Sequence, residues 1–183
     1  HRAGQRSARE RAGVPVVALI GYTNAGKSTL FNRLTQAGAL AEDRLFATLD
    51  PLTRRIMLPG GQEVLLSDTV GFIAKLPTDL VAAFRATLEE VIEADLILHV
   101  RNLSRDDAEA QSLDVEEVLR QLGIASQDEA RLIEVWNKVD LLDRAARERL
   151  DNRAERQPNG RRPVLVSALS GEGLDRLVGE IEA

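Results

Sequence analysis

A glycine-rich loop that joins an apolar run to a helix-forming segment constrains the fold of this chain more than any other feature. Residues 14–21 (VPVVALIG) are continuously apolar, which predicts a strand buried on both faces. Residues 21–28 (GYTNAGKS) match the pattern G-x-x-x-x-G-K-[ST], and residues 27–38 predict a helix that ends at Gly38. This order of strand, loop and helix predicts a phosphate-binding loop and argues against a chance match.

The loop suits a nucleotide and its magnesium ion. Backbone N–H groups from Asn24 to Ser28 would point at the phosphates from the positive end of the helix. Gly26 lets the backbone approach the phosphates, Lys27 neutralises the β and γ oxygens, and the Ser28 hydroxyl binds Mg²⁺. The residues predicted to hold the phosphates are Gly21, Tyr22, Thr23, Asn24, Ala25, Gly26, Lys27, Ser28 and Thr29.

Strand and helix signals alternate along the rest of the chain. Pro59-Gly60-Gly61 between two apolar segments predicts a hairpin, and residues 78–95 carry apolar side chains at helical spacing. Six strands interleaved with helices predict an α/β domain over residues 14–183. Its sheet is six-stranded and mostly parallel, with one antiparallel strand and helices on both faces. The other predicted strands are residues 96–100, 131–137 and 163–168, and the other predicted helices are residues 104–122, 141–156 and 171–183.

Two segments at predicted strand ends suit the recognition of guanine. In residues 137–140 (NKVD), the Asp140 carboxylate can accept hydrogen bonds from the ring N–H and the exocyclic amine, a donor pair that adenine lacks. The Lys138 stem would cover the base, whereas the alternative is that Asp140 caps a helix N-terminus. In residues 167–169 (SAL), the Ala168 N–H could donate to the guanine carbonyl. The residues predicted to bind the base are Asn137, Lys138, Val139, Asp140, Ser167, Ala168 and Leu169.

The segment SDTVGF, residues 67–72, lies at another predicted strand end. Asp68 would hold Mg²⁺ through a water molecule, and the Gly71 N–H would contact the γ-phosphate. A plain exit from strand to turn, with Gly71 as its breaker, is the alternative. The residues of this segment predicted to contact the nucleotide are Asp68, Thr69, Val70 and Gly71.

The segment FATLDP, residues 46–51, has no period of its own and could become ordered around the metal ion. Thr48 is therefore the predicted second hydroxyl ligand, in preference to Thr53 at the start of a strand. The predicted nucleotide contacts here are Phe46, Ala47, Thr48, Leu49 and Asp50. The predicted metal ligands are Ser28, Thr48 and Asp68, and the predicted catalytic groups are Lys27, Thr48 and Gly71.

Composition excludes several classes of protein. With 44% hydrophobic and 29% charged residues among 183, the chain suits one folded domain. Its net charge is −5 although residues 1–13 hold four arginines and one glutamate, so the acidic remainder does not suit nonspecific nucleic-acid binding. The absence of cysteine excludes disulfides, a thiol nucleophile and a Cys-ligated metal. The absence of cysteine also fits the predicted cytoplasmic location. The longest purely apolar run near the N-terminus, VVALI, is too short to span a membrane.

Five motifs together resemble those of the translation-factor-class P-loop GTPases: GYTNAGKS, FATLDP, DTVGF, NKVD and SAL. The narrower resemblance is to the HflX family of ribosome-associated GTPases, through FATLDP leading into RRI and through DTVGFIAKLPTDLVAAFRATLEEV. It covers the chain from about Gly13 to its end. The resemblance implies a Ras-like fold, GTP and Mg²⁺ as ligands, and the large ribosomal subunit with its RNA as partner and activator.

The chain departs from the family's pattern at its ends and at one strand. We expect the family's N-terminal domain and C-terminal extension to be missing, and residues 1–13 to be a linker or the tail of that missing domain. A solvated terminal helix and an RNA-facing arm are the alternatives for residues 1–13. Arg101 and Asn102 stand where the family has a hydrophobic residue and an aspartate.

The hydrolytic step lacks one expected group. Ras-type enzymes orient the attacking water with a glutamine directly after D-x-x-G, and here Phe72 stands in that place. We therefore expect slow intrinsic turnover that a partner completes; a GTP-dependent ribosome-binding module with negligible hydrolysis is the alternative. Asp140 argues against an ATP-using kinase. Asn24 either helps to hold K⁺ beside the phosphates, as in GTPases that this chain resembles, or forms a hydrogen bond within its loop.

Three further features suit structural roles. His99 lies inside an apolar strand and is predicted to be a core histidine instead of a general base. Trp136 is predicted to pack beneath the base-recognition loop. Residues 143–156 are predicted to form a solvated helix face with alternating charges.

Overall fold

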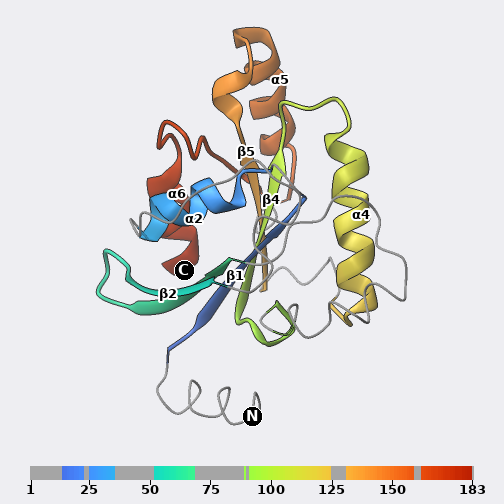
Figure 1. Cartoon of the computed structure of the whole chain (residues 1–183). Coiled ribbons are helices and arrows are strands. Elements are labelled where there is room, and N and C mark those ends of the chain that lie inside the picture. The colour runs from blue at the N-terminus through green and yellow to red at the C-terminus, as the bar shows by residue number, and fades with distance from the viewer. Residues whose placement is uncertain are drawn as a thin grey trace.

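The computed structural model describes residues 14–22, 25–35, 52–68, 89, 91–124, 131–158 and 162–182, in which strands and helices alternate (Figure 1). The strands are β1 (Val16–Gly21), β2 (Leu52–Met57), β3 (Glu63–Asp68), β4 (Leu96–Asn102), β5 (Leu132–Asn137) and β6 (Val164–Leu165). The helices are α2 (Lys27–Thr35), α4 (Ala108–Gln121), the 3-10 turn η1 (Val139–Leu141), α5 (Arg144–Glu155) and α6 (Leu174–Glu182). No helix in these described parts of the chain is both long and apolar enough for a membrane crossing.

The sheet has six strands in the order β2-β3-β1-β4-β5-β6. Every neighbouring pair is parallel except β2 and β3, which form the predicted antiparallel hairpin. Its turn is closed by two backbone hydrogen bonds of 2.8 Å, from Leu58 N–H to Gln62 O and from Gly61 N–H to Leu58 O. The predicted α/β architecture with one antiparallel strand is therefore confirmed.

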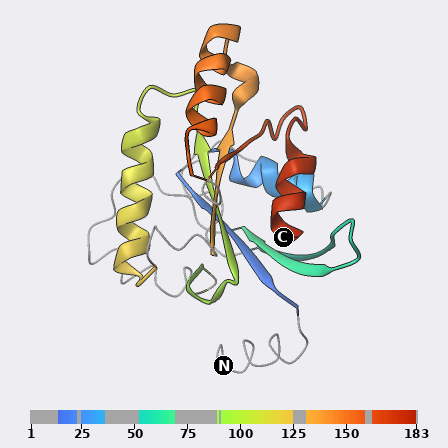
Figure 2. The same cartoon turned by 180° about the vertical axis from the view of Figure 1, so that it is seen from behind.

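The alternating side chains of β1 divide the core into two layers. Ala18 and Ile20 pack in one cluster with Val115 and Leu119 of α4. Odd-numbered residues of β1 pack in a second cluster with α2 and α6. Figures 1 and 2 show α4 on one face of the sheet and α2 and α6 on the other. Strands buried on both faces explain why the sequence of β1 is apolar throughout.

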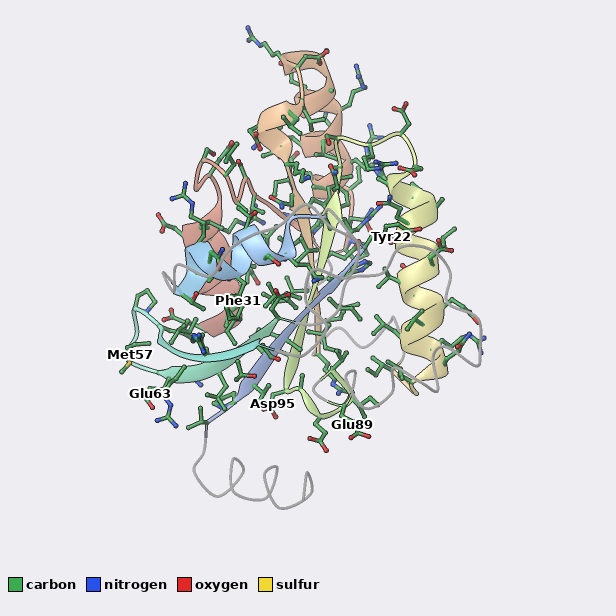
Figure 3. All side chains as sticks on the ribbon, in the orientation of Figure 1. Tyr22, Phe31, Met57, Glu63, Glu89 and Asp95 are labelled. Carbon is green, nitrogen blue, oxygen red and sulfur yellow. The ribbon has the colours of Figure 1, made fainter. Side chains whose placement is uncertain are left out.

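The start of β1 is fixed by a carboxylate that comes just before β4. Asp95 Oδ2 accepts a hydrogen bond of 2.8 Å from the Val16 N–H. Figure 3 shows Asp95 beside the end of β1 that is far from the glycine-rich loop. This contact fixes the amino end of β1 in the sheet. The glycine-rich loop begins at the other end of the strand, at the carboxyl edge of the sheet.

Some element boundaries differ from the predicted ones. β6 holds only two residues instead of the predicted 163–168, because its register pairing with β5 stops at Trp136 and Leu165. Val166 still bonds to its neighbours, with its N–H donating to Trp136 O at 2.8 Å and its O accepting from Val139 N–H at 3.3 Å. Of the helix predicted at 78–95, residues 89 and 91–95 are described; residues 89 and 91–93 are helical, whereas Ala94 and Asp95 are not, so the helix ends two residues before the predicted boundary. Residues 1–13 lie outside the described residues.

Candidate functional site

The glycine-rich loop leaves β1 at Gly21 and enters α2 at Lys27. A Cβ on Gly21 would lie 2.5 Å from the backbone oxygen of Val100 on β4, so glycine permits the close approach of these strands. Gly26 has φ +96°, and a Cβ there would lie 2.2 Å from Asn137 Nδ2. Both glycines are thus required by their neighbours in space, in addition to any approach to phosphate.

Lys27, Ser28 and Asp68 meet where α2 begins and β3 ends. Lys27 Nζ lies 3.2 Å from Asp68 Oδ1, and both side chains are buried. The Ser28 hydroxyl donates to Asp68 Oδ2 at 3.1 Å. The two predicted magnesium ligands of the described chain are therefore adjacent, and the cationic group predicted for phosphate lies beside them.

Ser28 and Asp68 suit a Mg²⁺ ion that is also bound by phosphate oxygens and water. They do not suit a metal ion whose ligands all come from protein side chains. Ser28 and Asp68 supply hard oxygen atoms. Within the described ranges no group of three or more His, Cys, Asp or Glu side chains could hold a metal ion. Mg²⁺ is commonly bound by one or two protein oxygens together with phosphate oxygens and water, which matches a serine and a carboxylate next to a phosphate loop.

Residues 137–140 form the predicted base loop, and the Asn137 side chain joins it both to the phosphate loop (residues 21–28) and to the loop at residues 167–169. Its Nδ2 donates to Ala25 O at 2.9 Å, across 112 positions of sequence. Its Oδ1 accepts from the Ala168 N–H at 3.0 Å. Asn137 is 1% exposed, so both bonds are protected from water. The structure thereby brings together three segments that are far apart in the chain.

The base loop is held by hydrogen bonds and not by a helix cap. The Ser167 hydroxyl donates to Asp140 Oδ1 at 2.8 Å. Asp140 makes no capping hydrogen bond, and Asp143 instead caps α5 by accepting from the Ala146 N–H at 2.7 Å. The alternative role of Asp140 as a helix cap is therefore wrong, and its carboxylate stays exposed at the carboxyl edge of the sheet.

Lys138 lies along the phosphate loop. It adopts φ 66° in the left-handed region, and its Cε lies 3.7 Å from the position that a Cβ on Gly26 would take. The aliphatic stem of Lys138 therefore reaches from residues 137–140 to Gly26 of the phosphate loop. The Ala168 N–H already donates to Asn137, so a guanine carbonyl would share this donor.

The Tyr22 side chain points away from the carboxyl edge of the sheet, where the phosphate and base loops lie. Its side chain packs against the cluster formed with α4, and burial raises the pKa of its hydroxyl, with smaller contributions from Asp114 and Asp107. Figure 3 shows Tyr22 on the α4 side of β1. Any contribution of Tyr22 to a nucleotide site comes from its backbone.

The departure at Arg101 has a structural explanation. Arg101 is 6% exposed and donates to Glu134 at 2.8 Å and to Glu109 at 3.0 Å. Its guanidinium carbon lies 5.6 Å from the centre of the Trp136 ring, and that of Arg153 lies 5.3 Å from it. Arg153 also pairs with Glu109. This network joins β4, β5, α4 and α5 beside the base loop.

Trp136 and His99 have the structural positions predicted for them. Trp136 packs with Val139 of the base loop and with Leu150 of α5. His99 is 2% exposed, and burial lowers its pKa to about 4, with Glu134 opposing that shift. His99 is therefore neutral at pH 7 and is not the general base of the site.

One contact was not predicted from the sequence. Arg33 of α2 donates from Nε to Ala168 O at 2.9 Å and from a terminal nitrogen to Leu169 O. The partners are 135 and 136 positions away, and no pattern within α2 marks Arg33 among its polar residues. Only the packing of α2 beside the last loop identifies it.

Several predicted site residues lie outside the described residues, and their roles stay predictions. They are Thr23, Asn24, Phe46, Ala47, Thr48, Leu49, Asp50, Thr69, Val70, Gly71 and Phe72. The competitor Thr53 lies in β2 opposite Ser67, as expected for a strand residue. Thr29 lies in the first turn of α2, Val139 is buried against Trp136, and the Leu169 side chain is 72% exposed.

A family model described as 50S ribosome-binding GTPase matches residues 16–138. The GTPase HflX of Lacrimispora saccharolytica is 50% identical over 182 residues, which cover 100% of this chain and 41% of that protein. The GTPase HflX of Escherichia coli is 47% identical over 172 residues, which cover 94% of this chain and 39% of that protein. The chain thus spans about two fifths of the length of these curated relatives.

Solved structures share the fold. A GTP-binding protein of Sulfolobus solfataricus in complex with GDP has a TM-score of 0.64 and 25% identity, over 97% of this chain and 54% of that one. A variant of Aquifex aeolicus Era bound to GDP·AlF4⁻ has a TM-score of 0.69 and 25% identity, over 92% of this chain and 55% of that one. Both likenesses agree with a Ras-like P-loop GTPase fold.

Proposed function

Because the chain belongs to the HflX family of 50S ribosome-binding GTPases, we propose that it is a cytoplasmic GTP-dependent switch. It binds GTP with Mg²⁺ and hydrolyses it slowly to GDP and phosphate, and the large ribosomal subunit accelerates that step. The observation that carries the proposal is the Asn137 side chain, which bonds to Ala25 and Ala168. A ligand with phosphates at one end and a base at the other fits loops that are fixed together in this way.

The proposed reaction transfers the γ-phosphoryl group to water. The bond from the γ-phosphorus to the bridging oxygen breaks while a bond to the water oxygen forms, and negative charge moves to the leaving diphosphate. The proton that the water loses passes to the released phosphate or to solvent. The positive charge of Lys27 would stabilise this negative charge, and the burial of Lys27 strengthens the attraction. Ser28 would ligate Mg²⁺ directly and Asp68 through water, and bound Mg²⁺ would neutralise phosphate charge as a Lewis acid. Thr48 and the Gly71 N–H complete the site in this proposal.

The base is recognised by residues 137–140 and 167–169. Asp140 accepts from the ring N–H and the exocyclic amine of guanine, and its bond from Ser167 orients the carboxylate for that task. The Lys138 stem covers the base, and the Ala168 N–H donates to the guanine carbonyl. Adenine would leave Asp140 without these donors, which gives the preference for guanine.

Slow turnover follows from Phe72 in the place where a glutamine would orient water. The partner would complete the site or order the segments that contain Thr48 and Gly71. Asn24 would hold K⁺ beside the phosphates, where the ion would add the positive charge that an arginine supplies in other GTPases. Each of these roles is part of the proposal.

The test is GTP hydrolysis in potassium buffer, with and without purified large ribosomal subunits. We expect slow release of phosphate from the chain alone and faster release with subunits. Lys27→Ala should abolish both, whereas Arg176→Gln on the exposed face of α6 should change neither. Equal rates in sodium and potassium would rule out the ion role of Asn24.

The outcomes separate the parts of the proposal. GTP binding without any hydrolysis, with or without subunits, would favour a ribosome-binding module in which the nucleotide acts as a ligand only. Hydrolysis that subunits do not stimulate would mean that this chain lacks the activating contact, and the same assay with the longer protein would then test the ribosomal role. Fast turnover without any partner would contradict the role given to Phe72.

A further inference from the structure

Arg33 connects the helix that begins at the phosphate loop to the last loop of the sheet. Its Nε donates to Ala168 O at 2.9 Å, and a terminal nitrogen donates to Leu169 O. We propose that Arg33 is a positioning residue for guanine recognition that holds the loop at residues 167–169 in register with α2. The inference rests on the proposed function, because it assigns part of the base specificity of the same site.

The loop at residues 167–169 depends on hydrogen bonds more than on packing. The Leu169 side chain is 72% exposed, so it adds little burial of apolar surface. On the side of β5, the Ala168 N–H donates to Asn137. On the side of α2, the carbonyls of Ala168 and Leu169 accept from Arg33. Ala168, whose N–H is proposed to meet the guanine carbonyl, is therefore held through its N–H on one side and through its carbonyl on the other.

The contact requires the shape of arginine. A planar guanidinium presents several donors in a fixed fork and can reach two successive carbonyls, whereas a lysine ammonium is a point charge on a flexible stem. The guanidinium lies beside the next turn, because its other terminal nitrogen is 3.8 Å from the position that a Cβ on Gly171 would take, an ordinary van der Waals distance.

The guanine amine is proposed to be bound by Asp140, and the hydrogen bonds that hold Asp140 in place do not involve Arg33. Asp140, proposed to bind the guanine amine, is oriented by the Ser167 hydroxyl at 2.8 Å. Ser167 is in turn fixed by Glu172 O, which accepts from its N–H at 2.9 Å, and by the Gly171 N–H, which donates to its O at 2.8 Å. Loss of Arg33 should therefore weaken recognition of the guanine carbonyl more than recognition of the amine.

The experiment compares three diphosphates by equilibrium titration in the presence of Mg²⁺. GDP carries both the carbonyl and the amine, and inosine diphosphate lacks the amine. 2-Aminopurine riboside diphosphate lacks the carbonyl and also the ring N–H that faces Asp140, a second loss that is the same for wild type and every Arg33 variant. Wild type, Arg33→Gln and Arg33→Lys are measured, with Arg176→Gln on α6 as the control. Thermal unfolding of each variant checks that the fold is intact.

We expect both Arg33 variants to bind GDP about three- to tenfold more weakly, the range for one or two hydrogen bonds. The preference for GDP over the 2-aminopurine analogue should fall by the same factor, while the preference over inosine diphosphate stays unchanged. Equal weakening of all three ligands, or no weakening, would overturn the positioning role. ADP is titrated with wild type as a fourth ligand. If wild type does not prefer GDP to ADP, the proposed guanine site itself fails, whatever the Arg33 variants do.

Discussion

At the scale of single residues, Gly26 is constrained by more than a predicted ligand. A methyl group there would lie 2.2 Å from Asn137 Nδ2, and φ is +96°, a region that L side chains rarely adopt. The sequence motif alone suggests that Gly26 makes room for phosphate. The structure adds that Gly26 makes room for Asn137, which joins the two loops of the site.

Gly26→Ala should therefore weaken GDP binding at least tenfold, by roughly 1.4 kcal/mol or more, because Asn137 must move. Gly123→Ala is the matched control, since Gly123 also has positive φ, at +83°, but a Cβ there would meet nothing within 4 Å. Both variants carry the backbone strain, and only the first displaces Asn137. Isothermal titration measures the affinity of each variant for GDP. Equal affinities of the two variants would show that Gly26 is not needed to make room for Asn137.

His99 gives a prediction about pH. Its folded pKa is about 4 against an ordinary value of 6.5, so the unfolded chain binds the proton more readily between these values. Stability conferred by the neutral histidine is complete above pH 6.5 and is lost as pH falls toward 4. We expect a loss of about 2 kcal/mol from pH 7 to pH 5.

Urea unfolding of wild type and His99→Leu at both pH values measures this effect. The variant should lose less stability on acidification, because it has no buried imidazole to protonate. Other groups that titrate in this range are common to both proteins, so they cancel in the comparison. The same pH dependence in both proteins would show that His99 does not carry it.

At the scale of elements, the last two residues of β4, Arg101 and Asn102, explain how the chain tolerates a change from its family's pattern. Arg101 uses Glu134 and Glu109 to join β5 and α4, and its guanidinium lies over Trp136. Asn102 Oδ1 accepts from the Ser104 N–H at 3.0 Å and so tightens the turn that follows the strand. A charged residue is stable at this position because its partners are supplied by neighbouring elements.

Arg101→Leu should lower the free energy of unfolding by about 2 kcal/mol, because Glu134 loses its partner and Trp136 loses a stacked cation. The penalty stays below that of a fully buried pair, since the Glu134 side chain is 32% exposed and keeps part of its hydration. Arg105→Ala removes an exposed pair with Asp107 and should leave stability unchanged. Urea unfolding of both variants tests this, and equal effects would contradict the structural role of Arg101.

At the scale of the whole molecule, the carboxyl edge of the sheet gathers loops from most of the chain. Asn137 bonds to Ala25 across 112 positions, and Arg33 bonds to Ala168 across 135. A ligand that binds across these loops should stabilise the entire domain, because unfolding would separate its contacts.

GDP with Mg²⁺ at about a hundred times its Kd should raise the free energy of unfolding by about 2.7 kcal/mol. Trp136 is the only tryptophan of the chain, so its fluorescence follows urea unfolding beside the base loop. Asn137→Ala should lose most of this stabilisation at the same GDP concentration. An unchanged unfolding curve on addition of GDP to wild type would contradict nucleotide binding across the loops.

The sequence by itself determined the features that depend on a few neighbouring residues. The buried run of β1, the glycine-rich turn into α2 and the Pro59-Gly60-Gly61 hairpin follow from local backbone preferences and hydrophobic periodicity. The alternation of such elements was also sufficient to predict the mostly parallel sheet with one antiparallel strand, because few arrangements bury their apolar faces.

Only the tertiary structure decided how the distant segments meet. It assigned Asp140 to Ser167 instead of a helix cap, gave Arg101 its partners on two other elements, and brought Arg33 to the loop at residues 167–169. These contacts depend on strand register and on which turn of a helix faces which loop. The physical reason is that a local pattern fixes the direction of a backbone over a few residues, whereas packing of the whole core fixes the distance between side chains that lie far apart in sequence.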